Sequence, residues 1–259
     1  MLPNSPALHY QAYQAVADLT TPMRSAARFL APWLHHSLFW LPHSRALRKA
    51  AAACEVLALS GLTHHRPPFN IDTVDTPSGT CAVTEETVFR TPFCSLLRFR
   101  KTPACGTEPK VLLVAPVSGH FATLLRGTVQ TLLQDHDVYV TDWHNVRDIP
   151  LSEGAFDLDT FIEHIIRFVD WLGPHTHLVA VCQPTVPTLA AVAVMAEDQH
   201  PHQPRSMTLM AGPIDCRINP TEVNNLATAK PMEWFESKLI GVVPLRYKGG
   251  MRRVYPGFL

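Results

Sequence analysis

The sequence predicts an α/β fold: a mostly parallel sheet with helices on both faces and a helical extension at the amino terminus. Three observations lead to this prediction. Short apolar runs alternate with helical patterns between residues 111 and 210, as they do in repeated strand–helix–strand units. Helical patterns without strands occupy residues 9–60, and one apolar run stops at Cys182, where a helical pattern begins at once.

Length and charge limit the classes of function. The chain has 259 residues, enough for one large domain with a substantial core. Lys plus Arg and Asp plus Glu both number 22, so no basic surface for nucleic acid is expected. Charged residues make up 17% and hydrophobic ones 46%. This low charge fits either a large core or work beside an apolar surface.

The cysteines and the amino terminus predict a cytoplasmic chain with reduced thiols. The six cysteines form no C-x-x-C pair and show no zinc-ligand spacing. The first twenty residues lack the basic and then apolar run of a signal peptide, and no window of eighteen apolar residues predicts a membrane span. We therefore expect no metal and no cofactor.

Three regions are predicted along the chain. Residues 1–65 form an N-terminal helical extension, residues 66–219 an α/β core that is incomplete, and residues 220–259 the start of a lid, an insertion or a C-terminal region. Aromatic residues gather in the extension between Phe29 and Trp40, among them Trp33 and Phe39. They indicate either packing between helices or an apolar surface for an insoluble substrate.

The elements expected in the core follow one another at short spacing. They are antiparallel edge strands within 84–100 after a linker at 66–80, then a strand at 111–117, a helix at 121–134, a strand at 138–141, a helix at 158–172, a strand at 178–181, a helix at 185–196 and a strand at 207–210. Trp234, Phe235 and Leu239 indicate a further helix.

The stretch around Cys182 is typical of a nucleophile elbow, in which the nucleophile lies on a sharp strand-to-helix turn. Ala180 is small enough for the close backbone approach that the turn needs, and Pro184 fits the first helical position. The backbone N–H of Gln183 is then placed to stabilise an oxyanion. The alternative is a buried structural thiol at the end of a core strand.

The loop after the first core strand is the expected source of a second oxyanion donor, near Ser118. Gly119 would let the backbone approach a substrate closely. His120 comes too early in the chain to be the base of this fold, so a substrate contact or a structural role is favoured.

The remaining acids and histidines do not complete a catalytic triad. Asp142 is expected to be a cap or loop residue rather than an acid, and Asp215 is better placed than Asp142 for the acid. His200 and His202 follow the elbow helix, about 20 Å from Cys182, and cannot be its base. Either the chain is an inactive relative, or it ends before its catalytic histidine, which is the favoured interpretation.

Four separated motifs resemble the bacterial intracellular polyhydroxyalkanoate (poly-3-hydroxybutyrate) depolymerases. They are residues 115–127 (APVSGHFATLLRG), 139–147 (YVTDWHNVR), 181–184 (VCQP) and 210–215 (MAGPID). The resemblance implies an α/β-hydrolase in which Cys182 attacks an ester of the stored polyester, in the cytoplasm at the granule surface. It also implies a catalytic Asp and His in a carboxyl-terminal part that this chain is expected to lack, so no residue here is assigned those roles.

Three functions remain open from the sequence. The first is hydrolysis of poly-3-hydroxybutyrate to 3-hydroxybutyrate units or oligomers through a Cys182 acyl-enzyme, with this chain alone expected to be inactive. The second is acyl transfer by a relative of polyester synthases or thioesterases, although a synthase cysteine is usually flanked by glycines. The third is granule binding without catalysis. The sequence does not indicate the oligomeric state or the polymer side chain.

Overall fold

The computed structural model describes residues 6–40, 44–61, 65–104, 108–117 and 121–256. Contacts divide the chain into two units. The smaller unit comprises residues 1–65, 232–244 and 253–259, and the larger comprises residues 66–231 and 245–252.

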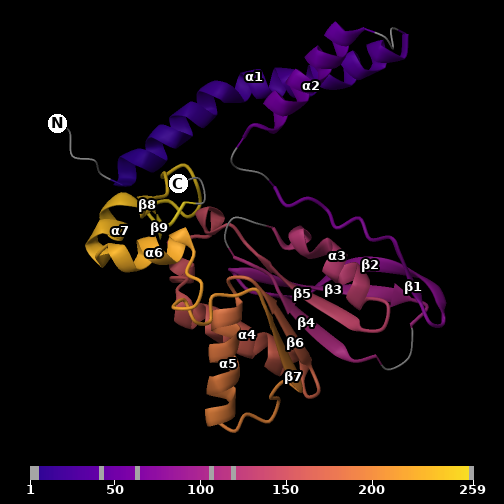
Figure 1. Ribbon diagram of the computed structural model, residues 1–259, viewed down its shortest axis with the longest axis vertical. Coiled ribbons are helices and arrows are strands. Elements are labelled where there is room, and N and C mark those ends of the chain that lie inside the picture. Colours follow the sequence, from indigo (N-terminus) through magenta and orange to yellow (C-terminus); the bar gives the residue numbers. More distant parts are fainter. Residues whose placement is uncertain (1–5, 41–43, 62–64, 105–107, 118–120, 257–259) are drawn as a thin grey trace. The chain divides into compact units, whose positions relative to one another are not determined.

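In the larger unit, the described residues form one seven-stranded sheet in the order β1-β2-β3-β5-β4-β6-β7 (Figure 1). The strands are β1 (Thr73–Thr76), β2 (Gly79–Arg90), β3 (Cys94–Thr102), β4 (Lys110–Val114), β5 (Asp137–Trp143), β6 (His177–Val181) and β7 (Ser206–Met210). Strands β5, β4, β6 and β7 are parallel, and β1, β2 and β3 add antiparallel pairs at one side. The predicted fold class is confirmed.

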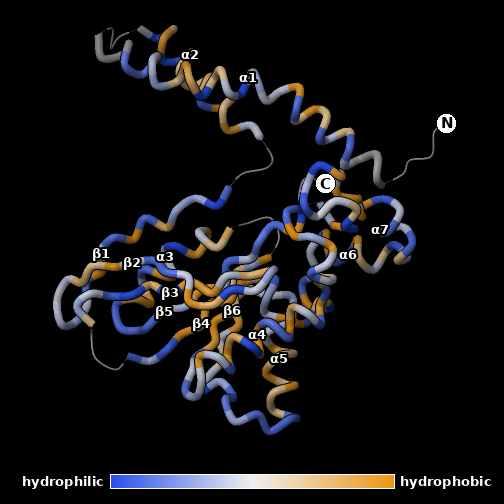
Figure 2. The backbone as a smooth tube through the Cα atoms, turned by 180° about the vertical axis from the view of Figure 1, so that it is seen from behind, coloured by the Kyte–Doolittle hydropathy of each residue, from blue (hydrophilic) through white to orange (hydrophobic). Residues whose placement is uncertain are grey.

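Helices cover both faces of this sheet. One face packs against η1 (Ala122–Leu125) and α3 (Arg126–Leu132), and the other against α4 (Leu158–Leu172) and α5 (Thr185–Glu197). Neighbouring residues of β4 point to opposite faces, so Leu113 joins the first core and Leu112 the second. Both residues are fully buried. After their polar first residues, Lys110 and His177, β4 and β6 are apolar, as strands covered on both sides must be, and the tube along them is mainly orange (Figure 2).

The edge of the sheet was partly mispredicted. Residues 66–80 were expected to be a linker, but they contain β1 and the start of β2, which pair from Thr73 with Ala82 to Thr76 with Gly79. An edge strand is held by its ladder of backbone hydrogen bonds and tolerates polar side chains. Composition alone therefore does not reveal it. The strands β4 and β5 also have different limits from the predicted 111–117 and 138–141.

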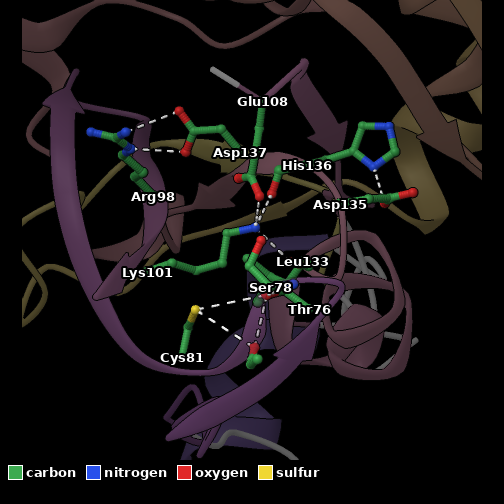
Figure 3. Close-up of polar contacts among 11 residues, drawn as sticks. Thr76, Ser78, Cys81, Arg98, Lys101, Glu108, Leu133, Asp135, His136 and Asp137 are labelled. Carbon is green, nitrogen blue, oxygen red and sulfur yellow. Dashed lines mark hydrogen bonds and ion pairs between the residues drawn. The ribbon is translucent and has the colours of Figure 1, made fainter. Parts of the chain in front are cut away.

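A polar network occupies the amino-terminal edge of the parallel strands (Figure 3). The buried amino group of Lys101 donates to Glu108 at 2.6 Å and to the carbonyls of Leu133 and His136 at 2.7 and 3.1 Å. Arg98 holds Asp137, the first residue of β5, with two hydrogen bonds of 3.0 Å. These charges satisfy one another, and open α/β sheets bind ligands at the opposite, carboxyl edge.

The last part of the larger unit is anchored by a buried arginine. Arg252 donates to the carbonyls of Ile149 at 3.1 Å, Pro150 at 2.7 Å and Gly154 at 2.7 Å. These residues belong to the loop that contains η2 (Val146–Asp148) and η3 (Leu151–Glu153). The predicted region 220–259 is therefore shared between the two units, because this anchor ties residues 245–252 to the core.

The smaller unit contains α1 (Pro6–Trp40), α2 (Arg45–Leu59), α7 (Met232–Lys238), β8 (Gly241–Val242) and β9 (Arg253–Val254). The two long helices bury the small side chains of Ala27, Ala51 and Ala58, which permits close approach. The first segment of the smaller unit ends at residue 65. The separate helix α6 (Glu222–Ala229) belongs to the larger unit. None of the helices in the described part is both long and apolar enough to span a bilayer.

Candidate active site

Cys182 lies on the turn between β6 and α5, at the carboxyl edge of the parallel strands. Its φ angle is 68°, in the left-handed region, and the residue is exposed. A side chain with Cβ adopts this conformation at a cost of about 1–2 kcal/mol, so the surrounding structure must impose it. The exposed position argues against the alternative of a buried structural thiol.

Backbone hydrogen bonds hold Cys182 on both sides. Its N–H donates to the Met210 carbonyl on the neighbouring strand at 2.8 Å. Its carbonyl accepts from the Thr185 N–H at 3.2 Å and from the Thr185 hydroxyl at 2.8 Å. Each such bond contributes about 0.5–1.5 kcal/mol, so together they offset the cost of the left-handed backbone.

The residues that flank Cys182 fit the tight turn, although one proline lies one position earlier in the helix than expected. Ala180 is fully buried. Pro184 is the N-cap of α5, one position earlier than predicted, with helical angles of φ −69° and ψ −3°. Pro187 lies in the first helical turn, where N–H groups have no partner within the helix.

Gly212 is a close-approach residue that sequence reasoning did not identify. A Cβ added at Gly212 would overlap the side chain of Thr185. The preceding Ala211 has a φ of 52°. The loop after β7 therefore presses against the first turn of α5, and the MAGPID motif contributes to the elbow from a distant part of the chain.

Of the two expected oxyanion donors, the structure describes Gln183 but not Ser118. Gln183 directly follows Cys182 and is exposed, so its backbone occupies the position used for an oxyanion donor in an elbow. Ser118, Gly119 and His120 lie outside the described residues.

The start of the loop after β4 is held by two side chains of β5. The Thr141 hydroxyl accepts from the Ala115 N–H at 2.9 Å, and the Trp143 indole N–H donates to the Ala115 carbonyl at 2.9 Å. Residues 141 and 143 point to the same side of their strand, so one strand satisfies both polar groups of Ala115. In the sequence, the only indication of this arrangement is a threonine and a tryptophan two residues apart at a strand end.

Asp142 and His144 both have structural partners in the described part of the chain. Asp142 belongs to the strand rather than to a cap or loop, and it forms an ion pair of 3.0 Å with Arg66. Burial raises the pKa of the Asp142 carboxyl, and the nearby Arg66 opposes that shift. His144 lies between the Ser95 hydroxyl and the Pro92 carbonyl, each at 2.8 Å.

Asp215 does not contact a histidine in the described structure. Its carboxylate accepts two hydrogen bonds of 2.8 Å from the Arg217 guanidinium, which lower its pKa. His200 and His202 lie beyond the far end of α5, where His202 contacts Asp170 at 2.9 Å. Among the described residues, no group of three or more His, Cys, Asp or Glu side chains is arranged to hold a metal ion.

Comparison with known proteins identifies the carboxyl-terminal part. The sequence model described as "PHB de-polymerase C-terminus" matches residues 211–259. The predicted resemblance to poly-3-hydroxybutyrate depolymerases is thus confirmed, on these residues. The matched segment begins directly after β7.

Solved structures similar to this chain at low identity include lipid and ester hydrolases. They include a bacterial membrane phospholipase A (16% identity, 57% of this chain and 46% of that chain, TM-score 0.43) and a bacterial brefeldin A esterase (12%, 74% and 52%, 0.43). A third is a fungal esterase from Rhizomucor miehei (11%, 71% and 66%, 0.43). The chain spans about half the length of the first two. Among curated proteins, none matches it significantly.

Proposed function

We propose that this chain carries the nucleophile of a carboxylic ester hydrolase whose substrate is poly-3-hydroxybutyrate, and that Cys182 is this nucleophile. The observation that carries the proposal is the exposed cysteine held at φ 68° between β6 and α5. Residues held in this backbone region cluster at active sites. The match of residues 211–259 to the depolymerase family supports the polyester as substrate.

The proposed reaction has two steps. The Cys182 thiolate attacks the ester carbonyl carbon, the carbon–oxygen bond breaks, and the departing alkoxide takes up a proton while a thioester forms. Water then hydrolyses the thioester and restores the thiol, releasing 3-hydroxybutyrate units or oligomers. Backbone N–H groups at Gln183 and near Ser118 would stabilise the oxyanion of each tetrahedral intermediate.

An activated ester tests the nucleophile without a demand for a general base. With 4-nitrophenyl butyrate, whose leaving group departs readily, the peptide containing Cys182 should gain the mass of a butyryl group. Cys216, the exposed cysteine after β7, is the matched control. Cys182→Ala should abolish acylation and Cys216→Ala should leave it unchanged. Labelling of Cys216 instead of Cys182 would refute the assignment.

The substrate class needs a separate assay. In a homologue that carries the same motifs and a catalytic histidine, release of 3-hydroxybutyrate from amorphous granules should depend on the cysteine that corresponds to Cys182, and transfer of the acyl group from 3-hydroxybutyryl-CoA to polymer should not occur. If the CoA thioester is consumed and the granules are not, the acyl-transferase alternative replaces the depolymerase. We place the reaction in the cytoplasm at the granule surface.

Granule binding without catalysis is the second candidate, and exposed apolar residues on α1 favour it. Phe29, Trp33 and Leu19 are 68%, 62% and 80% exposed. Binding of this chain to granules, with no acylation of Cys182 by 4-nitrophenyl butyrate, would support this function instead.

A further inference from the structure

Thr185, the first residue of α5, is tied to Cys182 more closely than helix geometry requires. Besides the turn bond from its N–H, its hydroxyl donates to the Cys182 carbonyl at 2.8 Å. We propose that Thr185 is a positioning residue: its hydroxyl holds the Cys182 carbonyl and thereby maintains the left-handed backbone that presents the thiol. This inference rests on the proposed nucleophilic role of Cys182.

The loop after β7 fixes the Thr185 side chain in turn. Thr185 is fully buried, and there is no space for a Cβ between it and Gly212. A β-branched side chain has few χ1 rotamers, and packing against Gly212 leaves the hydroxyl directed at Cys182. The residue just before this loop, Met210 at the end of β7, accepts the Cys182 N–H. The N–H of Cys182 therefore depends on residues 210–212 directly, and its carbonyl depends on them through Thr185.

Thr188 shows that this contact is particular to Thr185. It lies three residues further along α5 and is also fully buried, yet its hydroxyl has no hydrogen-bond partner among the described residues. Burial of a threonine in this helix therefore does not by itself produce a bond to the elbow. Replacement of each threonine by the nearly isosteric valine separates the hydrogen bond at 185 from packing.

Two reactions of the same thiol distinguish positioning from a merely structural role. Acylation of Cys182 by 4-nitrophenyl butyrate passes through an oxyanion that must be aligned with backbone donors. Alkylation by iodoacetamide forms no oxyanion and reports only thiol access and ionisation. Both rates can be followed on the Cys182 peptide by mass spectrometry.

Thr185→Val should slow acylation by about five- to tenfold, the effect of one lost hydrogen bond, and leave alkylation within about twofold. Thr185→Ser should restore the acylation rate because it keeps the hydroxyl. Thr188→Val should change neither rate. Thr185→Val that acylates at the unsubstituted rate, or Thr188→Val that slows acylation equally, would overturn the inference.

Two further outcomes also test the positioning role of Thr185. If Thr185→Val does not fold, Thr185→Ala compared with Thr185→Ser gives the same contrast, and equal acylation by these two variants would refute the role of the hydroxyl. If Cys182 of the unsubstituted chain is alkylated but never acylated, the nucleophile proposal fails, and the positioning role with it. Failure of the positioning role alone leaves normal acylation of the unsubstituted chain.

Discussion

His164 lies among aromatic rings inside the second core, where burial disfavours its charged form. The ring centres of Phe93, Trp143 and Phe156 are 6.1, 6.0 and 5.9 Å away. Its Nδ1 must donate to the Thr160 carbonyl at 2.7 Å, since a carbonyl cannot donate. Burial lowers the pKa of His164. Sequence reasoning did not single out this residue, and its contacts are those of a structural histidine.

This lowered pKa predicts a loss of stability in acid. The unfolded chain binds a proton at His164 near its ordinary pKa of about 6.5, and the folded chain binds one only at lower pH. Stability should therefore be fully present above that pH and fall below it, by at most about 1.4 kcal/mol per pH unit. Urea unfolding at several pH values measures this slope. His164→Gln should reduce it, whereas His177→Gln, at a partly exposed site, should not.

Thr141 provides a second prediction at the residue scale. Thr141→Val keeps the shape of this fully buried side chain but removes the acceptor of the Ala115 N–H. A buried donor without a partner costs about 1–3 kcal/mol, so the urea midpoint should fall accordingly. Thr131→Val, which removes an exposed hydroxyl of α3, is the control and should change stability little. An equal effect of both variants would contradict the proposed holding of Ala115.

Among the elements, residues 245–252 join the core through contacts that no local pattern predicts. The Gly249 N–H donates to the Arg147 carbonyl at 2.8 Å. A Cβ at Gly249 would lie 2.6 Å from the Val146 carbonyl oxygen and 2.9 Å from that of Ile149. These are backbone atoms, so the segment would have to move.

Gly249→Ala should therefore destabilise the larger unit by more than about 1 kcal/mol and expose residues 245–252 to protease. Gly127 in α3 is the matched control because a Cβ there meets nothing within 4 Å. Gly127→Ala should stabilise by about 0.4–1 kcal/mol, because alanine lowers the conformational entropy of the unfolded chain. Urea unfolding compares the two variants, and a neutral Gly249→Ala would show that the segment is loosely held.

Elements with strong periodicity were predictable, and those formed by distant contacts were not. The helix at 158–172 has the predicted limits, because its apolar residues recur on one face and Gly173 ends it. The strand-to-helix turn at Cys182 was also predictable, because consecutive residues determine it. Gly212, Thr141 and Trp143 take their roles from residues that folding brings near, so their importance follows only from the structure.

At the scale of the whole molecule, the proposed substrate is an apolar solid, so the protein must bind a surface to reach it. Helix α1 has the required chemistry in the described part of the chain. Phe29 and Trp33 lie one helical turn apart, their ring centres are 6.4 Å apart, and both are largely exposed. Of the residues expected to share this role, the side chains of Phe39 and Trp40 are outside the described part.

The double variant Phe29→Gln/Trp33→Gln should reduce co-sedimentation with poly-3-hydroxybutyrate granules severalfold, since it removes apolar area from contact at about 25 cal/mol per Å². Acylation of Cys182 by a soluble ester should be unchanged. The control is Leu151→Gln/Leu158→Gln, which removes two exposed leucines of the larger unit and should leave sedimentation unaltered. If the first variant unfolds, or if both pairs reduce binding equally, Phe29 and Trp33 do not form a specific docking surface.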